Sequence, residues 1–266
     1  MNNSTWKNKG IVLLSVILLL LVWSTVAKVM AIPIIIPSPV TTFFSFIDVV
    51  SSETFGRNLL VTVVRGLESF LIISVSATVF GLLSGFYPSV KAFLTPLLLI
   101  SKATPVMAVI LLAFIWFTSG TVPIFSAFLM AFPVMFIQVE SGVHNISKEL
   151  SEMTKVYGLS FSTKFFHFLL PSMSPFLISG AKSTLSMIWK VVIAAEVLTV
   201  PKYGVGSQMQ FAQINLETAT VLSWTIIAIL LTALSDSVFA FLLDRTTSYR
   251  KHKAEDEQLA EDTDDH

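Results

Sequence analysis

The chain of 266 residues contains no cysteine and few charged residues. The absence of cysteine excludes disulfides, thiolate metal ligands and a cysteine nucleophile. Only 13% of the residues are charged, against roughly 25% in an ordinary soluble domain. Hydrophobic residues make up 54% of the chain, and its mean hydropathy is +0.78. This composition excludes a disordered chain, a nucleic-acid binder and a typical soluble enzyme, and it predicts an all-α polytopic membrane protein.

Several catalytic patterns are also missing from the sequence. No Gly-x-x-x-x-Gly-Lys-Ser/Thr loop is present, so the chain is not expected to hold ATP in that way. Neither a Gly-x-Ser-x-Gly elbow nor a His-Glu-x-x-His pair occurs. All four histidines, His144, His167, His252 and His266, fall in predicted cytoplasmic segments. We therefore expect no catalytic residue, no metal site and no bound cofactor in this chain.

Six apolar segments are long enough to cross a membrane, which takes about 20 apolar residues for a core of about 30 Å. The predicted spans cover about 11–31, 60–87, 92–118, 121–139, 174–198 and 218–243. The uncharged run 103–139, of 37 residues, is too long for one crossing, and turn residues at Ser119-Gly120-Thr121 divide it between the third and fourth spans. Three prolines between Pro33 and Pro39 end the first span, and 40–56 is predicted to be a mixed external segment. Residues 1–245 are predicted to form one transmembrane domain.

The distribution of Lys and Arg predicts the orientation, because cytoplasmic loops are enriched in these residues. With the N-terminus inside, ten of them fall in inner segments and three in outer segments. The inner ones are Lys7, Lys9, Lys91, Lys148, Lys155, Lys164, Arg245, Arg250, Lys251 and Lys253, and the outer ones are Lys28, Arg57 and Lys202. Both termini and the loop 140–171 are therefore predicted to be cytoplasmic. The tail 246–266 is acidic and is expected to be disordered.

Charged residues within the predicted spans are candidates for a translocation pathway or gate, because an unpartnered charge in a membrane is costly. Arg65 and Glu68 can pair on one helix face, and Lys102 lies in the third span. At about 100° per residue, six polar residues of the fifth span fall within an arc of about 140°. They are Ser179, Lys182, Ser183, Ser186, Lys190 and Glu196. This face lines either a water-filled path or a contact with another helix; structural pairing is an equally weighted alternative for each residue.

Small residues recur every four positions in the second span, at Ala77, Gly81 and Gly85. This spacing allows another helix to approach closely. We interpret the stripe as helix packing, and we favour packing within one subunit over packing between subunits.

The cytoplasmic loop carries a spaced pattern of helix signals. Ser147 can cap a short helix that Gly158 ends, and Ser160 or Ser162 can cap a second helix that ends before Pro171. The spacing resembles the EAA loop of binding-protein-dependent ABC importer permeases. That pattern is Glu-Ala-Ala, three residues, Gly, nine residues, an aliphatic residue, any residue and Leu-Pro.

The gap lengths of this loop agree with the family pattern throughout, with departures at three positions. Glu152, Gly158 and Leu170-Pro171 occupy the Glu, Gly and Leu-Pro positions. Met153 and Thr154 replace the two alanines, and Phe168 replaces the aliphatic residue. The resemblance implies that the loop couples to an ATPase through Glu149, Glu152, Met153, Thr154, Gly158, Leu170 and Pro171.

Other segments resemble the nitrate, sulfonate and taurine branch of these permeases: Pro37-Ser38-Pro39, Thr62-Val-Val-Arg65 and Ala194-Ala195-Glu196. The resemblance implies a type I ABC importer transmembrane domain in the bacterial cytoplasmic (inner) membrane, working by alternating access. It implies two cytoplasmic ATPase subunits that hold ATP and Mg, a second copy of the permease or a similar chain, and an extracytoplasmic solute-binding protein. Membrane lipid is expected as a partner and nucleic acid is not.

Two other functions stay open at this point. An ion-coupled secondary transporter would use the intramembrane charges as its coupling site, although no internal repeat is visible. A membrane-embedded enzyme is disfavoured by the missing catalytic patterns. The solute is open among sulfonates, nitrate, taurine, similar anions and vitamin precursors.

Overall fold

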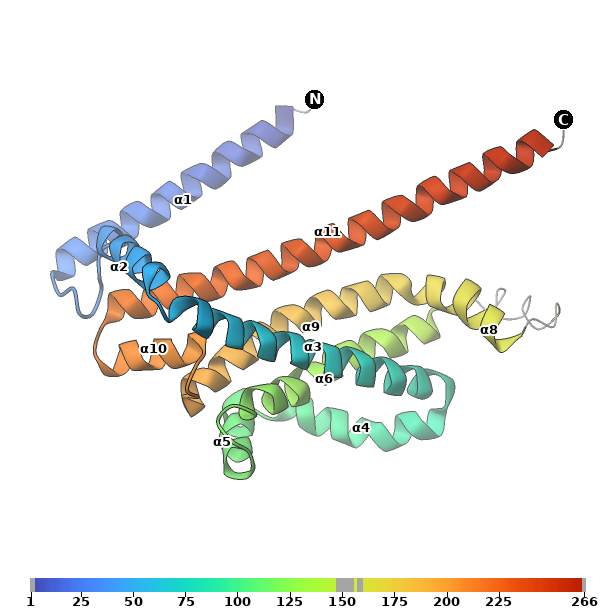
Figure 1. Cartoon of the computed structure of the whole chain (residues 1–266), viewed down its shortest axis with the longest axis horizontal. Coiled ribbons are helices and arrows are strands. Elements are labelled where there is room, and N and C mark those ends of the chain that lie inside the picture. Colours follow the sequence, from blue (N-terminus) through green and yellow to red (C-terminus); the bar gives the residue numbers. More distant parts are fainter. Residues whose placement is uncertain (1–2, 147–155, 157–159, 265–266) are drawn as a thin grey trace. The chain divides into compact units, whose positions relative to one another are not determined.

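The structure of the protein is a computed structural model that describes residues 3–146, 156 and 160–264. Every element in these residues is helical, and no strand occurs among them (Figure 1). The elements are α1 (Asn3–Met30), α2 (Pro39–Ser51), α3 (Phe55–Phe86), α4 (Pro88–Ala103), α5 (Val106–Trp116), α6 (Val122–His144), α8 (Phe161–Lys164), the π-helix η1 (Phe165–Leu169), α9 (Leu170–Thr199), α10 (Val205–Ile214) and α11 (Thr218–Asp264).

Five helical segments are long and apolar enough to cross a membrane. They are Gly10–Met30, Phe55–Phe86, Val122–His144, Ser162–Thr199 and Thr218–Leu243. The pair α4 and α5 supplies a sixth if its two helices cross together. The predicted all-α polytopic fold is confirmed.

The predicted third span, 92–118, is not one continuous helix. The helix α4 ends at Ala103 and α5 begins at Val106. Between them, Thr104 has an extended backbone with φ −76° and ψ 128°. Thr104 precedes Pro105, and a residue before proline avoids the α region. A hydropathy pattern cannot reveal this break, whereas the Thr-Pro pair does.

Three other segments also differ from expectation. Part of the mixed segment 40–56 forms α2, with Pro39 in its first turn and the Ser38 Oγ accepting a hydrogen bond from the Thr41 N–H at 3.1 Å. The tail 246–266, expected to be disordered, is helical as far as Asp264. It contains no Gly or Pro and is rich in strong helix formers such as Ala, Glu and Lys. The helix predicted to end before Pro171 continues through η1 into α9, because a local π-turn can accommodate a proline.

The chain divides into two compact units. Unit 1 comprises Met1–Arg65, Met107–Ser126 and Val192–Ala228, and unit 2 comprises Gly66–Val106, Ala127–Val191 and Ile229–His266. The helices α3, α6, α9 and α11 each contribute a segment to both units.

Unit 1 has a small apolar core of buried Val49, Val205, Trp224 and Ile227. The Trp224 ring lies 5.9 Å from the Phe55 ring, measured between centroids. The Ser223 hydroxyl, which is fully buried, donates to the carbonyl of Thr42 at 3.3 Å. These contacts fasten α2 and the start of α3 to α10 and α11 within this unit.

Unit 2 packs α3 closely against α6 along the stripe of small residues. A Cβ added at Gly81 would lie 2.7 Å from the Val139 Cβ, and one at Gly85 would lie 2.5 Å from the Val143 Cβ. Ala77, on the same stripe, is fully buried. The two helices therefore approach to a distance that only glycine permits at these positions.

Candidate functional site

A buried polar cluster in unit 1 surrounds the carboxylate of Glu196, near the C-terminal end of α9. We call it the Glu196 cluster: the side chains of Asn58, Thr62, Arg65 and Glu196, with the backbone of 203–206. The residues Glu196, Thr62 and Asn58 have no exposed surface, and the Arg65 side chain is 11% exposed. Buried charges of this kind persist in a protein only when they are paired and hydrogen-bonded.

Several donors converge on the Glu196 carboxylate. The Arg65 Nη1 donates to Oε1 at 2.6 Å, and the Thr62 Oγ1 lies 3.0 Å from Oε1 and 2.9 Å from Oε2. The Gly206 N–H donates to Oε2 at 3.0 Å. These bonds compensate the carboxylate for the loss of water.

The same α3 side chains bind the segment that follows α9. Arg65 Nη1 donates to the Tyr203 carbonyl at 2.9 Å, and the Val205 N–H donates to the Thr62 Oγ1 at 2.9 Å. The Gly204 N–H donates to the Asn58 Oδ1 at 3.0 Å. Positions 58, 62 and 65 lie on one face of a helix. One face of α3 therefore holds both the end of α9 and the start of α10.

Two glycines allow this segment to reach the carboxylate. A Cβ at Gly204 would lie 2.6 Å from the Glu196 Cδ. A Cβ at Gly206 would lie 2.4 Å from the Ile193 carbonyl oxygen and 2.8 Å from the Val197 nitrogen, both of which are backbone atoms. Neither position has room for a larger residue while the cluster is intact.

The end of α9 is strained where it enters this cluster. Val200 has a φ of +43°, a left-handed conformation that β-branched residues strongly disfavour. Strain of this kind costs about 1–3 kcal/mol and persists only where the surroundings enforce it. Here the Thr199 hydroxyl donates to the carbonyls of Ala195 at 2.8 Å and Ser119 at 3.3 Å. Members of the Glu196 cluster also flank Val200 in the sequence, with Glu196 before it and 203–206 after it.

The sequence expectation for Arg65 differs from the structure. Glu68, its expected partner, is exposed, and the ion pair forms with Glu196 on another helix. The partner lies 131 residues away, so helix periodicity alone could not identify it. Asn58 and Gly204 were not identified from the sequence, although both leave a signal in it. Asn58 lies on a polar face of an otherwise apolar helix, and Gly204 belongs to a Gly-Val-Gly segment.

The other five residues of the polar arc predicted for the fifth span lie in unit 2 and have a different environment. Four of them are exposed, and we call these the α9 stripe: Ser179, Lys182, Ser183 and Lys190. The fifth, Ser186, donates to the Asp236 carboxylate of α11 at 3.0 Å and 3.2 Å. Lys102, on α4, is also exposed.

A second polar contact in unit 2 was not singled out from the sequence. The Glu140 Oε1 accepts from the Ser84 hydroxyl at 3.1 Å and from the Lys91 ammonium at 3.0 Å. This contact ties the end of α3 and the start of α4 to α6.

The predicted coupling residues fall mostly outside the described part of the chain. Those outside it are Glu149, Glu152, Met153, Thr154 and Gly158. Leu170 and Pro171 form the first turn of α9. The capping expectation for the second loop helix is confirmed, since the Ser160 Oγ accepts from the Thr163 N–H at 3.2 Å.

A comparison with known families decides what kind of protein carries this architecture. The sequence profile of the binding-protein-dependent transport system inner membrane component matches residues 77–248, more than half of the chain. The chain belongs to this family. It is accordingly a multi-pass inner membrane protein with the type I ABC permease fold.

Relatives from different organisms are similar to this chain over about half or more of its length. The taurine transport system permease protein TauC of Escherichia coli is 26% identical over 233 residues, covering 85% of this chain and 82% of TauC. The permease protein SsuC of Bacillus subtilis, named for the transport of aliphatic sulfonates, is 27% identical over 240 residues, covering 89% and 85%. The nitrate import permease protein NrtB of Leptolyngbya laminosa is 27% identical over 131 residues, covering 49% and 47%.

Proposed function

We propose that the chain is the permease subunit of an ATP-driven importer for a small anion, such as a sulfonate, taurine or nitrate. The family membership carries this proposal, and the relatives named for these solutes support the class of substrate. A vitamin precursor is the other solute class consistent with the sequence resemblance.

The proposed importer contains more than this chain. Two cytoplasmic ATPase subunits would bind ATP and Mg²⁺, and a solute-binding protein would deliver the anion from outside. A second copy of the permease, or a similar chain, would complete the transmembrane domain. In this proposal both termini and the loop 140–171 face the cytoplasm, as the positive-inside rule predicts.

The α9 stripe is the proposed lining of the translocation path. Lys182 and Lys190 are exposed on a membrane-spanning segment, Ser162–Thr199. Ammonium groups facing hydrocarbon are costly, so such residues normally face a protein partner or a water-filled cavity. A second permease copy across a wet path would satisfy this requirement. Lysines lining that path would also attract an anion.

The Glu196 cluster has another proposed role in the same cycle. Its charged groups are buried and paired, so they offer no free charge to a passing solute. We assign it to holding α3, α9 and α10 together while the transmembrane domain alternates between its inward and outward states. Arg65 and Glu196 are positioning residues in this proposal rather than solute ligands.

Coupling to the ATPase is proposed to occur through the loop pattern around Glu152 and Gly158. Gly158→Val should reduce ATPase co-purification and lower solute-stimulated ATP hydrolysis by about tenfold, or about 1.4 kcal/mol of coupling. Glu152→Ala should reduce it less, because alanine removes one carboxylate and leaves the backbone preferences of the loop intact. Membrane insertion should survive both changes, since it depends on the apolar spans.

The complete importer, purified and reconstituted in vesicles, tests the proposal. The binding protein is first screened by thermal shift against taurine, an alkanesulfonate, nitrate and a pyrimidine vitamin precursor. We expect uptake of the stabilising solute to require both ATP and the binding protein. Uptake driven by an ion gradient without ATP would contradict the proposal and favour a secondary transporter.

A further inference from the structure

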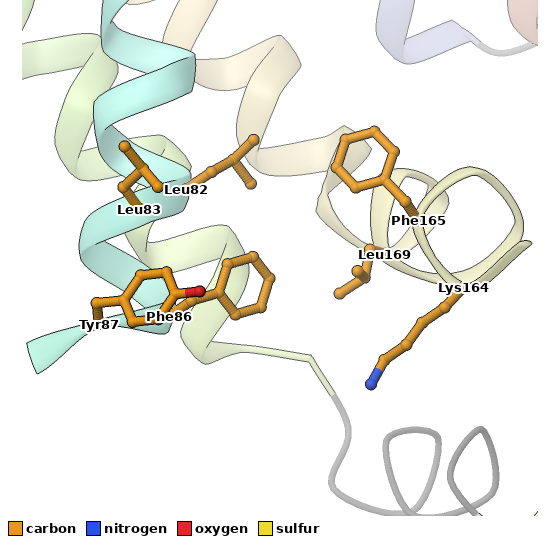
Figure 2. Close-up of a pocket in the computed structure, with 7 residues that line it drawn as sticks. All are labelled: Leu82, Leu83, Phe86, Tyr87, Lys164, Phe165 and Leu169. Carbon is orange, nitrogen blue, oxygen red and sulfur yellow. The ribbon is translucent and has the colours of Figure 1, made fainter. Parts of the chain in front are cut away.

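A cavity of about 500 Å³ lies in unit 2, between the C-terminal end of α3 and the segment formed by α8 and η1. Figure 2 shows the two walls facing each other, with Leu83, Phe86 and Tyr87 on one side and Lys164, Phe165 and Leu169 on the other. Its volume falls within the roughly 300–1,000 Å³ typical of small-molecule sites. The proposed transport cycle does not use this cavity.

The lining combines an apolar interior with two polar groups. Most of the lining residues are Leu and Phe, and the two with polar side-chain groups are Tyr87, with its hydroxyl, and Lys164, with its ammonium. Tyr87 is 58% exposed and Phe86 is 45% exposed, so the cavity opens to the surroundings. Among the described residues, Lys164 takes part in neither of the two ion pairs found. Such a site suits a ligand with a long apolar part and an anionic group.

The cavity lies where two membrane-spanning segments end. Phe86 is the last residue of the span Phe55–Phe86, and Lys164 is the third residue of the span Ser162–Thr199. Residues at span ends lie at the level of the lipid headgroups, where tyrosine and lysine are common. Phospholipid is therefore the amphiphile present in greatest excess at this depth.

A π-helical turn forms one wall of the cavity. The helix η1 spans Phe165–Leu169, and both of these residues line the cavity. Single π-turns are rare and are frequently found at functional sites. The same turn leads directly into Leu170 and Pro171, the last residues of the proposed coupling loop.

We propose that this cavity binds an anionic phospholipid. One acyl chain would lie between Leu83, Phe86 and Phe165, and the phosphate would bind the Lys164 ammonium with the Tyr87 hydroxyl donating to it. Basic pockets at the cytoplasmic ends of membrane helices are suited to anionic headgroups. The bound lipid would brace the segment that joins the coupling loop to α9, so that import depends on anionic lipid.

Lipid retention by the complete importer tests the site. The complex is purified from vesicles of dioleoylphosphatidylcholine and dioleoylphosphatidylglycerol mixed 7:3, and bound lipids are counted by native mass spectrometry. We expect the ratio of phosphatidylglycerol to phosphatidylcholine among the lipids that the wild type retains to be about tenfold higher than in the vesicles. Lys164→Gln should lose this preference. Leu83→Trp, which fills the apolar part, should lower retention of both lipids.

Matched controls separate the site from general effects of charge and folding. Lys102→Gln removes an exposed lysine of unit 2 that does not line the cavity, and it should retain lipid as the wild type does. A photoreactive residue at position 83 should crosslink to phosphatidylglycerol even if Leu83→Trp fails to assemble. Soluble glycerophosphoglycerol should not compete, because it has no acyl chain.

Three results would overturn the proposal. One is equal phosphatidylglycerol retention in the wild type, Lys164→Gln and Lys102→Gln. Another is full competition by glycerophosphoglycerol, which would make the site a phosphate site without a lipid. The third is crosslinking from position 83 to the ATPase in place of lipid. The proposed import function is measured separately, as ATP-dependent uptake. None of these three results would contradict it.

Discussion

Lys190 and Glu196 lie six residues apart on α9, yet Lys190 is exposed and Glu196 is fully buried. The carboxylate of Glu196 has three partners, namely Arg65, Thr62 and the Gly206 backbone. The ammonium of Lys190 belongs to the exposed α9 stripe in the other compact unit. The helix α9 therefore carries one charge, on Glu196, that is paired within unit 1. It carries another, on Lys190, that is exposed in unit 2.

This difference separates two uses of charge in a membrane protein. Removing one partner of a buried ion pair is strongly destabilising, because the other charge stays behind without compensation. Replacing an exposed charged residue usually changes stability little. Loss of stability should therefore identify the Glu196 cluster, and loss of transport without loss of stability should identify the α9 stripe.

The largest expected effect is that of Glu196→Ala. This change leaves the Arg65 guanidinium buried and removes the acceptor for Thr62 and Gly206, so we expect a loss of about 3–5 kcal/mol. The measurement is the midpoint of thermal unfolding of the purified protein in detergent. Glu68→Ala, which removes an exposed acid of α3, is the control and should unfold near the wild-type midpoint. Equal midpoints for the two variants would show that the pair does not stabilise unit 1.

A smaller loss is expected from Gly206→Ala. The added methyl would meet two backbone atoms of α9, which cannot move aside as a side chain can. Overpacking of this kind costs about 1–3 kcal/mol. In Gly56→Ala the methyl meets nothing within 4 Å, and alanine reduces the conformational entropy of the unfolded chain, which stabilises by about 0.4–1 kcal/mol. The two variants should shift the unfolding midpoint in opposite directions, and a shift in the same direction would refute the close approach at Gly206.

In unit 2, we expect Ser84→Ala to lower the free energy of unfolding by about 1 kcal/mol. Ser84→Ala removes one of the two partners of Glu140, and an ordinary hydrogen bond contributes about 0.5–1.5 kcal/mol. Ser76→Ala is a control on the same helix, because the Ser76 hydroxyl bonds within α3, to the Ile72 carbonyl at 2.6 Å and the Ile73 carbonyl at 3.3 Å. Unfolding midpoints that fall equally in both variants would show that the Ser84 contact contributes nothing to α3–α6 packing.

The smallest effect on stability is expected from the α9 stripe itself. Lys182→Gln and Lys190→Gln replace exposed residues, and such changes usually stay within about 0.5 kcal/mol. The unfolding midpoint in detergent should therefore stay close to that of the wild type. A fall in the midpoint as large as that of Glu196→Ala would mean that these lysines stabilise the fold. That result would contradict the distinction between the α9 stripe and the Glu196 cluster.

The sequence predicted the elements that depend on local pattern. Apolar run length identified the spanning segments, and the spacing of small residues picked out Gly81 and Gly85, which lie against α6. The break at Thr104 was missed because the apolar runs on both sides of it were taken together as one span, and hydropathy does not report a change of helix direction. The proline that follows Thr104 was the informative residue.

The candidate site was harder to predict because it depends on contacts between distant segments. Helix periodicity placed Glu196 on the same polar face as Lys190, although only Glu196 is buried. The partners of Glu196 come from α3 and from the backbone around Gly206, and side-chain chemistry alone gives no indication of the backbone donors. Burial is a property of the packed helices rather than of the α9 sequence.

The most direct test measures ATP-dependent uptake and the unfolding midpoint on the same preparations of Lys190→Gln and Lys28→Gln. Lys28 is an exposed lysine in the last turn of α1, outside the stripe, so it controls for the loss of one positive charge. We predict that Lys190→Gln lowers uptake at least about tenfold, or about 1.4 kcal/mol, with an unchanged midpoint. Lys28→Gln should leave both quantities unchanged. Normal uptake by a stable Lys190→Gln importer would contradict the central claim that the exposed charges of α9 serve transport.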